Sequence, residues 1–391
     1  MNYAFGDTTK GDYAYESAPN STDLTWETVI TKNIGLDLGF LNNRLNVSFD
    51  AYIRDTKDML MAGKTLPGVY GASSPRMNVA DLRTKGWEAS VTWGDSFTLA
   101  SKPFNYRIMA GIGDNTSKVT KYDNPNRTLT DPYEGQQLGE IWGYVVDGYF
   151  KTDEEARNYK VDQSFVNQMI NASALDNGLH AGDPKFVDLD GNNKIEQTTS
   201  ANDRKDMKVI GNSLPRYNYN FGISADWYGI DFSVLFQGIG KQNWYPGAET
   251  SMFWGPYSRP YASFIPSDFM SQVWSEENTN AYFPRPRGYV ALGSNRELAV
   301  VNTKYLQNLA YCRLKNLSIG YTLPDKWLSK IGFEKIRVYF SGENLLTFTK
   351  LHSDYIDPEQ ASASNSWKTS KSDANIYPWA KTYSFGVDIT F

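Results

Sequence analysis

The chain ends with Tyr383-Ser384-Phe385-Gly386-Val387-Asp388-Ile389-Thr390-Phe391, in which large apolar residues occupy every odd position and small or polar residues every even one. Because successive side chains of a β-strand point to opposite faces, this stretch predicts a strand with one apolar and one polar face. A β-sandwich buries such an apolar face in a core, whereas a transmembrane β-barrel turns it to lipid.

The same alternation recurs along the chain and predicts nine strands in all. The other predicted strands lie within 34–40, 45–53, 87–93, 106–112, 217–227, 230–237, 316–323 and 336–341. The predicted connections between them alternate in length, with short ones at 42–43, 95–103, 228–229 and 324–335 and long ones at 60–81, 121–209, 242–303 and 348–377. Short turns at one end and long loops at the other are typical of outer-membrane barrels, so this pattern favours a barrel over a sandwich.

The pattern also predicts how the chain is organised. We expect an extracellular loop, four strands, a long insertion with a helix at 153–175, two strands, an aromatic loop and the final strands. The corresponding ranges are 1–32, 33–120, 121–209, 210–241, 242–303 and 304–391. Since bacterial single-chain barrels have even strand numbers and open edges are forbidden in lipid, nine strands indicate either a miscount or part of a larger barrel. No signal peptide is visible, so we expect the true N-terminus to lie elsewhere.

The composition excludes several classes of function. No stretch approaches the ~20 apolar residues that a spanning helix needs, so only a barrel could carry this chain through a membrane. The net charge of −5 provides no basic field for nucleic acid. The single Cys312 and the two histidines, His180 and His352, argue against a cysteine-based metal site and a histidine-rich catalytic centre. Aromatic residues make up 15% of the chain, as expected of barrel girdles or sugar-binding platforms.

Several motifs in order along the chain resemble the C-terminal part of SusC/RagA-family TonB-dependent transporters of Bacteroidetes. They are S-T-D-L-T-W-E at 21–27, N-I-G-L-D at 33–37 with N-N-R-L at 42–45, T-K-G-W-E at 84–88, V-I-G-N-S-L-P at 209–215, F-Q-G at 236–238, R-L-K-N-L-S-I-G-Y at 313–321 and G-E-N-L-L at 342–346.

The resemblance implies an all-β fold, in which these strands are the last nine or so of a 22-stranded transmembrane barrel. It implies an outer-membrane location with extracellular loops and a periplasmic C-terminus. It further implies an N-terminal barrel part with a plug, a SusD-like surface lipoprotein as lid, and TonB as the source of energy. The expected substrates are oligosaccharides or peptides, and no enzymatic activity is expected.

The stretch from Asp188 to Ile195 is similar to the first eight positions of a calcium-binding loop. Asp188, Asp190 and Asn192 stand at positions 1, 3 and 5, and Lys194 would offer its carbonyl at position 7. Position 6 is Asn193 instead of glycine, and position 12 is Thr199, which cannot chelate with two oxygens. Asp203 or Asp206 is available to fold back instead. We therefore expect a structural divalent cation, with a metal-free turn rich in Asx residues as the alternative.

A second candidate site is the aromatic loop, because flat rings suit the C–H faces of sugars. The residues expected to contact substrate are Trp244, Tyr245, Phe253, Trp254, Tyr257, Arg259, Tyr261 and Trp367. The alternative is that these rings pack the loop or meet the lid. Trp87, Trp93, Trp227, Trp327 and Tyr383 are expected instead in a membrane girdle, and Glu88, Arg107, Asp231 and Arg337 in wall hydrogen bonds and ion pairs.

Three other functions stay open. A siderophore or cobalamin receptor would have a similar last strand but would lack the R-L-K-N and I-G-N motifs. An outer-membrane enzyme needs a nucleophile and a base at the wall or mouth, and no histidine falls on a predicted strand. A passive porin would be independent of TonB.

Overall fold

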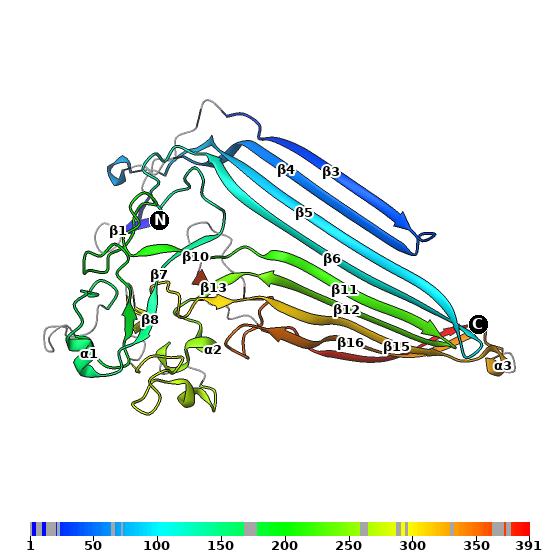
Figure 1. Ribbon diagram of the computed structural model, residues 1–391. Helices are drawn as coiled ribbons and strands as arrows, with labels where there is room; N and C mark the ends of the chain where they lie inside the picture. The colour runs from blue at the N-terminus through cyan, green and yellow to red at the C-terminus, as the bar shows by residue number, and fades with distance from the viewer. Residues whose placement is uncertain are drawn as a thin grey trace.

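Nine long strands form one antiparallel sheet in this computed structural model (Figure 1). In sheet order they are β18 (Thr382–Thr390), β16 (Lys335–Thr349), β15 (Tyr311–Thr322), β12 (Ile230–Lys241), β11 (Arg216–Trp227), β6 (Lys102–Lys121), β5 (Arg76–Leu99), β4 (Leu45–Ala62) and β3 (Thr28–Phe40). The structure describes residues 2–4, 10–12, 21, 24–63, 67–71, 73–167, 178–258, 265–286, 291–293, 296–328, 332–361, 371–372 and 377–391. Each strand pairs with its neighbours in the sequence, which confirms the predicted meander of nine strands.

The register of the sheet aligns the apolar residues of all nine strands on one face. One cross-strand row runs Leu38, Val47, Val91, Ala110 and Phe221, and Phe221 stacks on Phe236 of the next strand with ring centroids 4.8 Å apart. Many large side chains of this face remain exposed, among them Val91 at 38% and Phe385 at 83%, whereas Val47 and Ala110 are half-buried between their neighbours. A sandwich would bury this face under a second sheet, so the exposure argues for the barrel.

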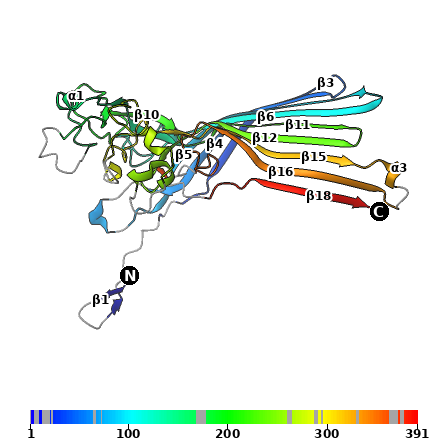
Figure 2. The same ribbon diagram turned by 90° about the horizontal axis from the view of Figure 1, so that it is seen from below.

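Short turns lie at one end of the sheet and long connections at the other, as predicted (Figures 1 and 2). The first turn places Asn42 and Asn43 at positive φ, a conformation that asparagine tolerates better than most residues. Two predicted connections prove shorter, because β5 and β6 turn at Ala100 and Ser101 and the loop after β4 covers only 63–75. The last turn carries α3 (Asp325–Leu328).

Aromatic residues collect near the short turns, at one edge of the apolar face. Trp93 Nε1 donates to Tyr106 Oη at 2.9 Å, and Trp227 Nε1 donates to the carbonyl of Leu99 at 3.1 Å. Trp327 on α3 is exposed at the same end, whereas Trp87 and Tyr383 lie on strands nearer the long loops. Two levels of aromatic residues on one face are typical of the belts at both surfaces of a bilayer.

The long connections pack into a loop body at the other end of the sheet (Figure 1). Its short elements are β7 (Glu140–Tyr144), β8 (Val146–Tyr149), β9 (Pro184–Phe186), β10 (Met207–Asn212), β13 (Asn243–Pro246), β14 (Gln307–Asn308), β17 (Lys371–Ser372), α1 (Asp153–Arg157), α2 (Ser251–Trp254) and 3-10 helices at Gly68–Tyr70, Gly255–Tyr257 and Phe269–Gln272. A hairpin of β1 (Asn2–Ala4) and β2 (Lys10–Asp12) stands apart from the loop body (Figure 2). Within the described ranges, no helix is long and apolar enough to cross a membrane.

Two sequence predictions about these connections are wrong in part. Range 1–32 was expected to be loop throughout, but β1 and β2 form a small hairpin and β3 already begins at Thr28. The helix expected at 153–175 is only α1, because residues 158–167 continue without helical structure. The rest of that predicted helix lies outside the described residues.

A register shift interrupts β15 between Leu314 and Asn316, where it pairs with both neighbouring strands. Beyond this bulge, Arg313 pairs with Gln237 on the polar face of the sheet, although Leu317, four residues away, belongs to the apolar face. The bulge thereby places Arg313 where it meets the loop body.

Candidate functional site

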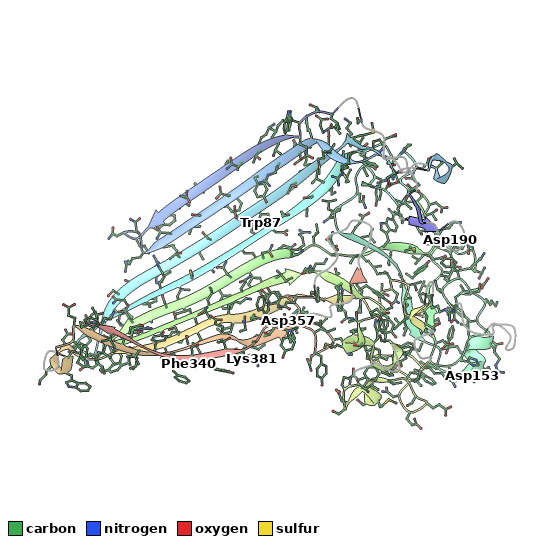
Figure 3. All side chains as sticks on the ribbon, turned by 180° about the vertical axis from the view of Figure 1, so that it is seen from behind. Trp87, Asp153, Asp190, Phe340, Asp357 and Lys381 are labelled. Atoms are coloured by element: carbon green, nitrogen blue, oxygen red, sulfur yellow. The ribbon has the colours of Figure 1, made fainter. Side chains whose placement is uncertain are left out.

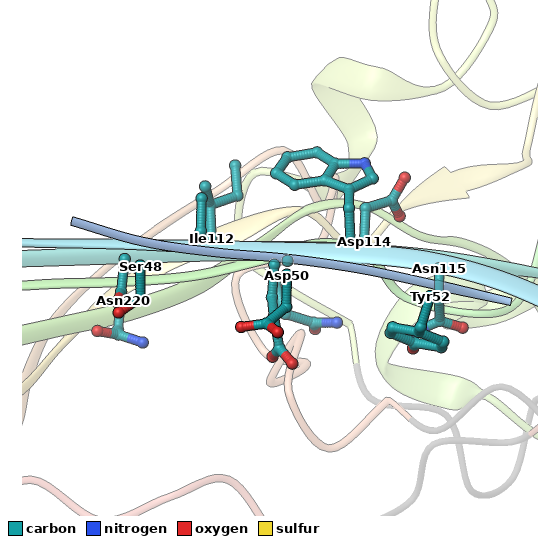
Figure 4. A pocket seen from close by; sticks show the side chains of 14 residues that line it. Ser48, Asp50, Tyr52, Ile112, Asp114, Asn115 and Asn220 are labelled. Atoms are coloured by element: carbon teal, nitrogen blue, oxygen red, sulfur yellow. The ribbon is translucent and has the colours of Figure 1, made fainter. Parts of the chain in front are cut away.

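A groove of about 450 Å³ lies on the polar face, between the middle strands of the sheet (Figure 4). Figure 4 shows Ser48, Asp50, Tyr52 and Asn220 on one side of the sheet and Ile112 on the other. Asp50 faces Glu88 directly across β4 and β5, and Asn220 pairs with Gly111 of β6. Carboxylates, amides and hydroxyls therefore line the groove, and they suit a solute rich in hydrogen-bonding groups.

Glycines opposite tyrosines allow the rings to lie against this wall. A Cβ added at Gly86 would clash with the ring of Tyr52, and one added at Gly386 would clash with the ring of Tyr339. A larger residue in either place would displace the ring, which gives a physical reason for the glycine in the T-K-G-W-E motif.

Ion pairs on the same face, nearer the short turns, join β16 to its neighbour β18 and, across β15, to β12. Arg337 donates to both carboxylate oxygens of Asp231, at 2.9 and 2.7 Å, and to Asp388 at 3.1 Å. Arg107 lies on this face as well, opposite Ser224 of β11. Glu88, the fourth predicted wall residue, lines the groove. The pairs link three strands of the wall on the side that faces away from the apolar surface.

The expectation of substrate contact is wrong for five residues of the aromatic loop. Trp244, Tyr245, Phe253, Trp254 and Tyr257 are each 0–2% exposed and form the main hydrophobic core of the loop body. Their polar atoms are satisfied internally, since the indole of Trp254 donates to the Gly247 carbonyl at 2.9 Å and the hydroxyl of Tyr245 to the Leu298 carbonyl at 2.8 Å. The other three predicted contacts, Arg259, Tyr261 and Trp367, lie outside the described residues.

A cavity that the sequence analysis missed opens between β15, β16 and the segment that follows β16. It measures about 750 Å³ and is lined by Met252, Tyr355, Ile356, Pro358, Tyr377 and Lys381, among others. Tyr355 is 45% exposed and Tyr377 is 88% exposed. Figure 3 places Asp357 and Lys381 where the sheet meets the loop body. The exposed aromatic surface therefore lies in the range 348–377, where the sequence had pointed only to Trp367 as a substrate contact.

Arg313 holds this segment against the sheet through a buried ionic network. Arg313 is 2% exposed, and its guanidinium donates to Asp357 at 2.7 Å, to Glu359 at 2.6 Å and to Thr347 at 2.9 Å. Lys315 also donates to both oxygens of Glu359, at 2.8 and 2.7 Å. The first and third residues of the R-L-K-N motif thus anchor the floor of the cavity.

The candidate cation site brings together Asp188, Asp190 and Asp206, each with one carboxylate oxygen within 4.8 Å of the others. Of the two carboxylates that the sequence offered, Asp206 lies at the turn, and the carboxylate of Asp203 lies instead 3.9 Å from the ammonium of Lys205. Both oxygens of Asp206 accept backbone hydrogen bonds, from Leu189 at 2.8 Å and Glu196 at 2.7 Å. Burial raises the pKa of Asp206, and the nearby carboxylates of Asp190 and Asp188 raise it further.

The turn that presents these oxygens is tightly ordered. Gly191 and Asn193 both have positive φ, and their amides donate to the two oxygens of Asp188, each at 2.7 Å. The side-chain oxygen of Asn192 accepts from the Lys194 amide at 2.8 Å. Ile195 anchors the end of the turn in a small core with Tyr144, Val166 and Phe186. Oxygen ligands in such a turn suit a hard cation.

Figure 3 shows the labelled Asp190 in the loop body, away from the sheet. The groove and the cavity, by contrast, are built on the strands of the sheet. A cation bound between Asp188 and Asp206 would therefore order the loop body and would not line the wall.

Comparisons with known proteins agree with this architecture. The model of the family described as "TonB dependent receptor-like, beta-barrel" matches residues 2–345. TonB-dependent receptor P3 of Formosa agariphila is 28% identical over 388 residues, which are 94% of this chain and 34% of that protein. TonB-dependent receptor SusC of Bacteroides thetaiotaomicron is 25% identical over 397 residues, covering 100% of this chain and 34% of that protein.

A solved structure shares the fold. The structure titled "Structure of the RagAB peptide transporter" matches 100% of this chain and 38% of its own chain, with a TM-score of 0.67 and 21% identity. This chain therefore spans about a third of the length of the curated relatives it matches. The open sheet of nine strands is accordingly part of a larger barrel, as the sequence predicted.

Proposed function

Because the chain belongs to the TonB-dependent receptor-like β-barrel family, we propose that it forms part of the wall of a SusC/RagA-type transporter that imports oligosaccharides or peptides across the outer membrane. One observation carries the proposal: a sheet with an exposed apolar face, a polar opposite face and loops sorted by length. A wall between lipid and a water-filled lumen requires this division. The loop body then lies outside the cell and Phe391 in the periplasm.

The polar groove and the cavity support an import path along the wall. Hydroxyl, amide and carboxylate groups in the groove exchange hydrogen bonds with a polar solute at little net cost, so they permit passage instead of tight binding. The cavity beside Tyr355 and Tyr377 offers ring faces near the mouth, where a sugar ring or an apolar peptide side chain fits. In this view the cavity selects the substrate and the groove conducts it.

The proposal includes three protein partners. The remainder of the barrel with its plug closes the sheet, since the edges of β3 and β18 cannot remain unpaired in lipid. A SusD-like lipoprotein covers the loop body as a lid, and TonB drives release of the substrate into the periplasm. Purification of the complete transporter in detergent should therefore also yield a surface lipoprotein.

Uptake by living cells tests the function directly. Cells that carry the complete transporter should accumulate a labelled oligosaccharide or peptide, and uptake should stop when either TonB or the lipoprotein is deleted. Uptake that survives the loss of TonB would identify a passive porin instead. Uptake of an iron chelate or cobalamin alone would favour the receptor class that the sequence analysis kept open. Hydrolysis of an ester or peptide by the purified protein would revive the outer-membrane enzyme.

We also propose that the turn from Asp188 to Asn193, together with Asp206, binds a structural calcium ion. Three carboxylates in close proximity repel one another, and a divalent cation removes that repulsion. The ion would contribute no chemistry to transport; its role would be to stabilise the loop body.

A further inference from the structure

Basic side chains gather on the apolar face of the sheet, just beyond the apolar residues on the side of the long loops. They are Lys32 on β3, Lys57 on β4, Arg83 and Lys85 on β5, and Lys118 on β6, and we call them the basic patch. All five are exposed.

The register shows that the patch belongs to the apolar face. The row that contains Trp87 runs Ile34, Ala51, Trp87 and Asp114. Two residues further along the strands, the corresponding row on the same face contains Lys32, Ile53, Lys85 and Thr116. Two residues beyond that, it contains Ile30, Asp55, Arg83 and Lys118.

The carboxylate of Asp55 lies within the patch, and Arg83 already holds it. Asp55 accepts from Nε of Arg83 at 2.6 Å and from Nη2 at 3.1 Å. In the part of the chain that the structure describes, the four lysines make no ion pair within 4.0 Å. The next basic residue along the sheet differs, because Arg216 is neutralised by both oxygens of Asp114 at 2.5 Å. The five residues of the basic patch therefore leave an excess of positive charge on β3–β6.

The height of the patch relative to the apolar band matches a headgroup layer. From Phe104, near the short turn, to Asp114, β6 advances roughly 34 Å at ~3.4 Å per residue. At a tilt of about 40° this spans ~25 Å, the height of the apolar band of a barrel. The rows of Lys85 and Arg83, two and four residues beyond Trp87, stand about 5 and 10 Å above the hydrocarbon edge. Lys57, six residues beyond Ala51, stands about 15 Å above it.

We propose that the basic patch binds the phosphate groups of anionic lipid headgroups in the leaflet next to the long loops. The inference rests on the proposed membrane location and adds a lipid partner to it. Ammonium and guanidinium groups beside an aromatic belt attract phosphate at close range, and the attraction is screened within a Debye length. Trp87 and Ile34 would contact the acyl chains below the bound headgroup.

The test uses the complete transporter, reconstituted into nanodiscs of phosphatidylcholine with or without phosphatidic acid. Native mass spectrometry counts the phosphatidic acid retained by the wild type, by K32Q/K85Q/K118Q and by the control K160Q/K326Q/K350Q. The control removes the same charge at exposed lysines away from the patch. We expect a loss of about five-fold in lipid affinity per charge removed, hence roughly a hundred-fold for the patch variant, and no loss for the control.

Each outcome has a definite meaning. Equal retention by the wild type and the patch variant overturns the inference. Displacement of the lipid by inorganic phosphate at matched ionic strength overturns it in favour of a small-anion site. If the protein inserts and imports substrate but does not prefer phosphatidic acid, lipid binding by the basic patch is refuted while the proposed function stands. If the protein does not insert into the bilayer, both the proposed function and lipid binding by the patch are refuted.

Discussion

Replacement of Arg313 by methionine should release the segment that follows β16 while leaving the sheet folded. Arg313 is almost completely buried and compensates Asp357, whose side chain is 5% exposed. Removal of one partner from a buried ion pair costs about 3–5 kcal/mol, because the remaining charge stays desolvated. Lys315 still neutralises Glu359, so the penalty falls mainly on Asp357.

Hydrogen exchange measures this penalty locally. If this loss of about 3–5 kcal/mol acts through local opening of the segment, hydrogen-exchange protection of the amides of 350–361 should fall by about two to three and a half orders of magnitude. The amides of β11 and β12 should remain protected. Replacement of both partners in R313M/D357L should restore much of the protection, because an apolar pair leaves no buried charge.

The exposed ion pair of Arg44 with Asp95 is the matched control. Its atoms lie 3.0 Å apart, but the side chains are 46% and 25% exposed, so R44Q should cost at most ~1 kcal/mol. If R313M loosens 350–361 no more than R44Q loosens its own turn, the network does not anchor the segment and the reasoning fails.

Three further predictions concern the apolar face, the cation site and the loop body. F221K should destabilise the folded barrel in liposomes, lowering its free energy of unfolding by about 2–4 kcal/mol, while N220K on the opposite face should be tolerated. Equal effects of the two substitutions would contradict the assignment of faces. Calcium should protect the loop body from protease, and D188N should abolish that protection while D203N retains it; identical behaviour of the two variants would exclude the site. Burial lowers the pKa of His352, so the folded state favours the neutral ring, and the loop body should lose stability as the pH falls below about 6.5; H352Q should flatten this dependence in a protease-resistance assay.

The alternation of side chains was sufficient to predict the sheet. The position of residues such as Leu36 and Phe385 along their strands predicts which face they occupy, because a strand has only two faces and the lipid side accepts only apolar side chains. The ends of strands were harder to predict, as at β5, because the residues beyond the apolar band leave the lipid and lose the constraint. The length of the loops likewise predicted which end of the sheet carries the loop body.

The role of the aromatic loop could not be read from its composition. A ring that stacks on a sugar and a ring that packs a core are the same residue, and only tertiary burial separates them. One signal was available: the connection from 242 to 310 is too long to remain without a core, and Leu298 and Leu309 lie within it. Asp206 was harder to assign than Asp188 because folding, not a local spacing rule, brings it to the turn.

The bulge at Lys315 determines whether the side chain of Arg313 lies on the polar or on the apolar face of the sheet. Successive residues of a strand face lipid and water in turn, so one extra residue moves the side chains on one side of it to the opposite face. Deletion of Lys315 would keep every neighbouring letter of the motif and yet send a guanidinium toward the hydrocarbon. In alignments of related chains, a gap at Lys315 should therefore be read as moving the neighbouring residues to the opposite face of the sheet. Chimaeras that exchange loops between relatives should place their junctions away from this residue.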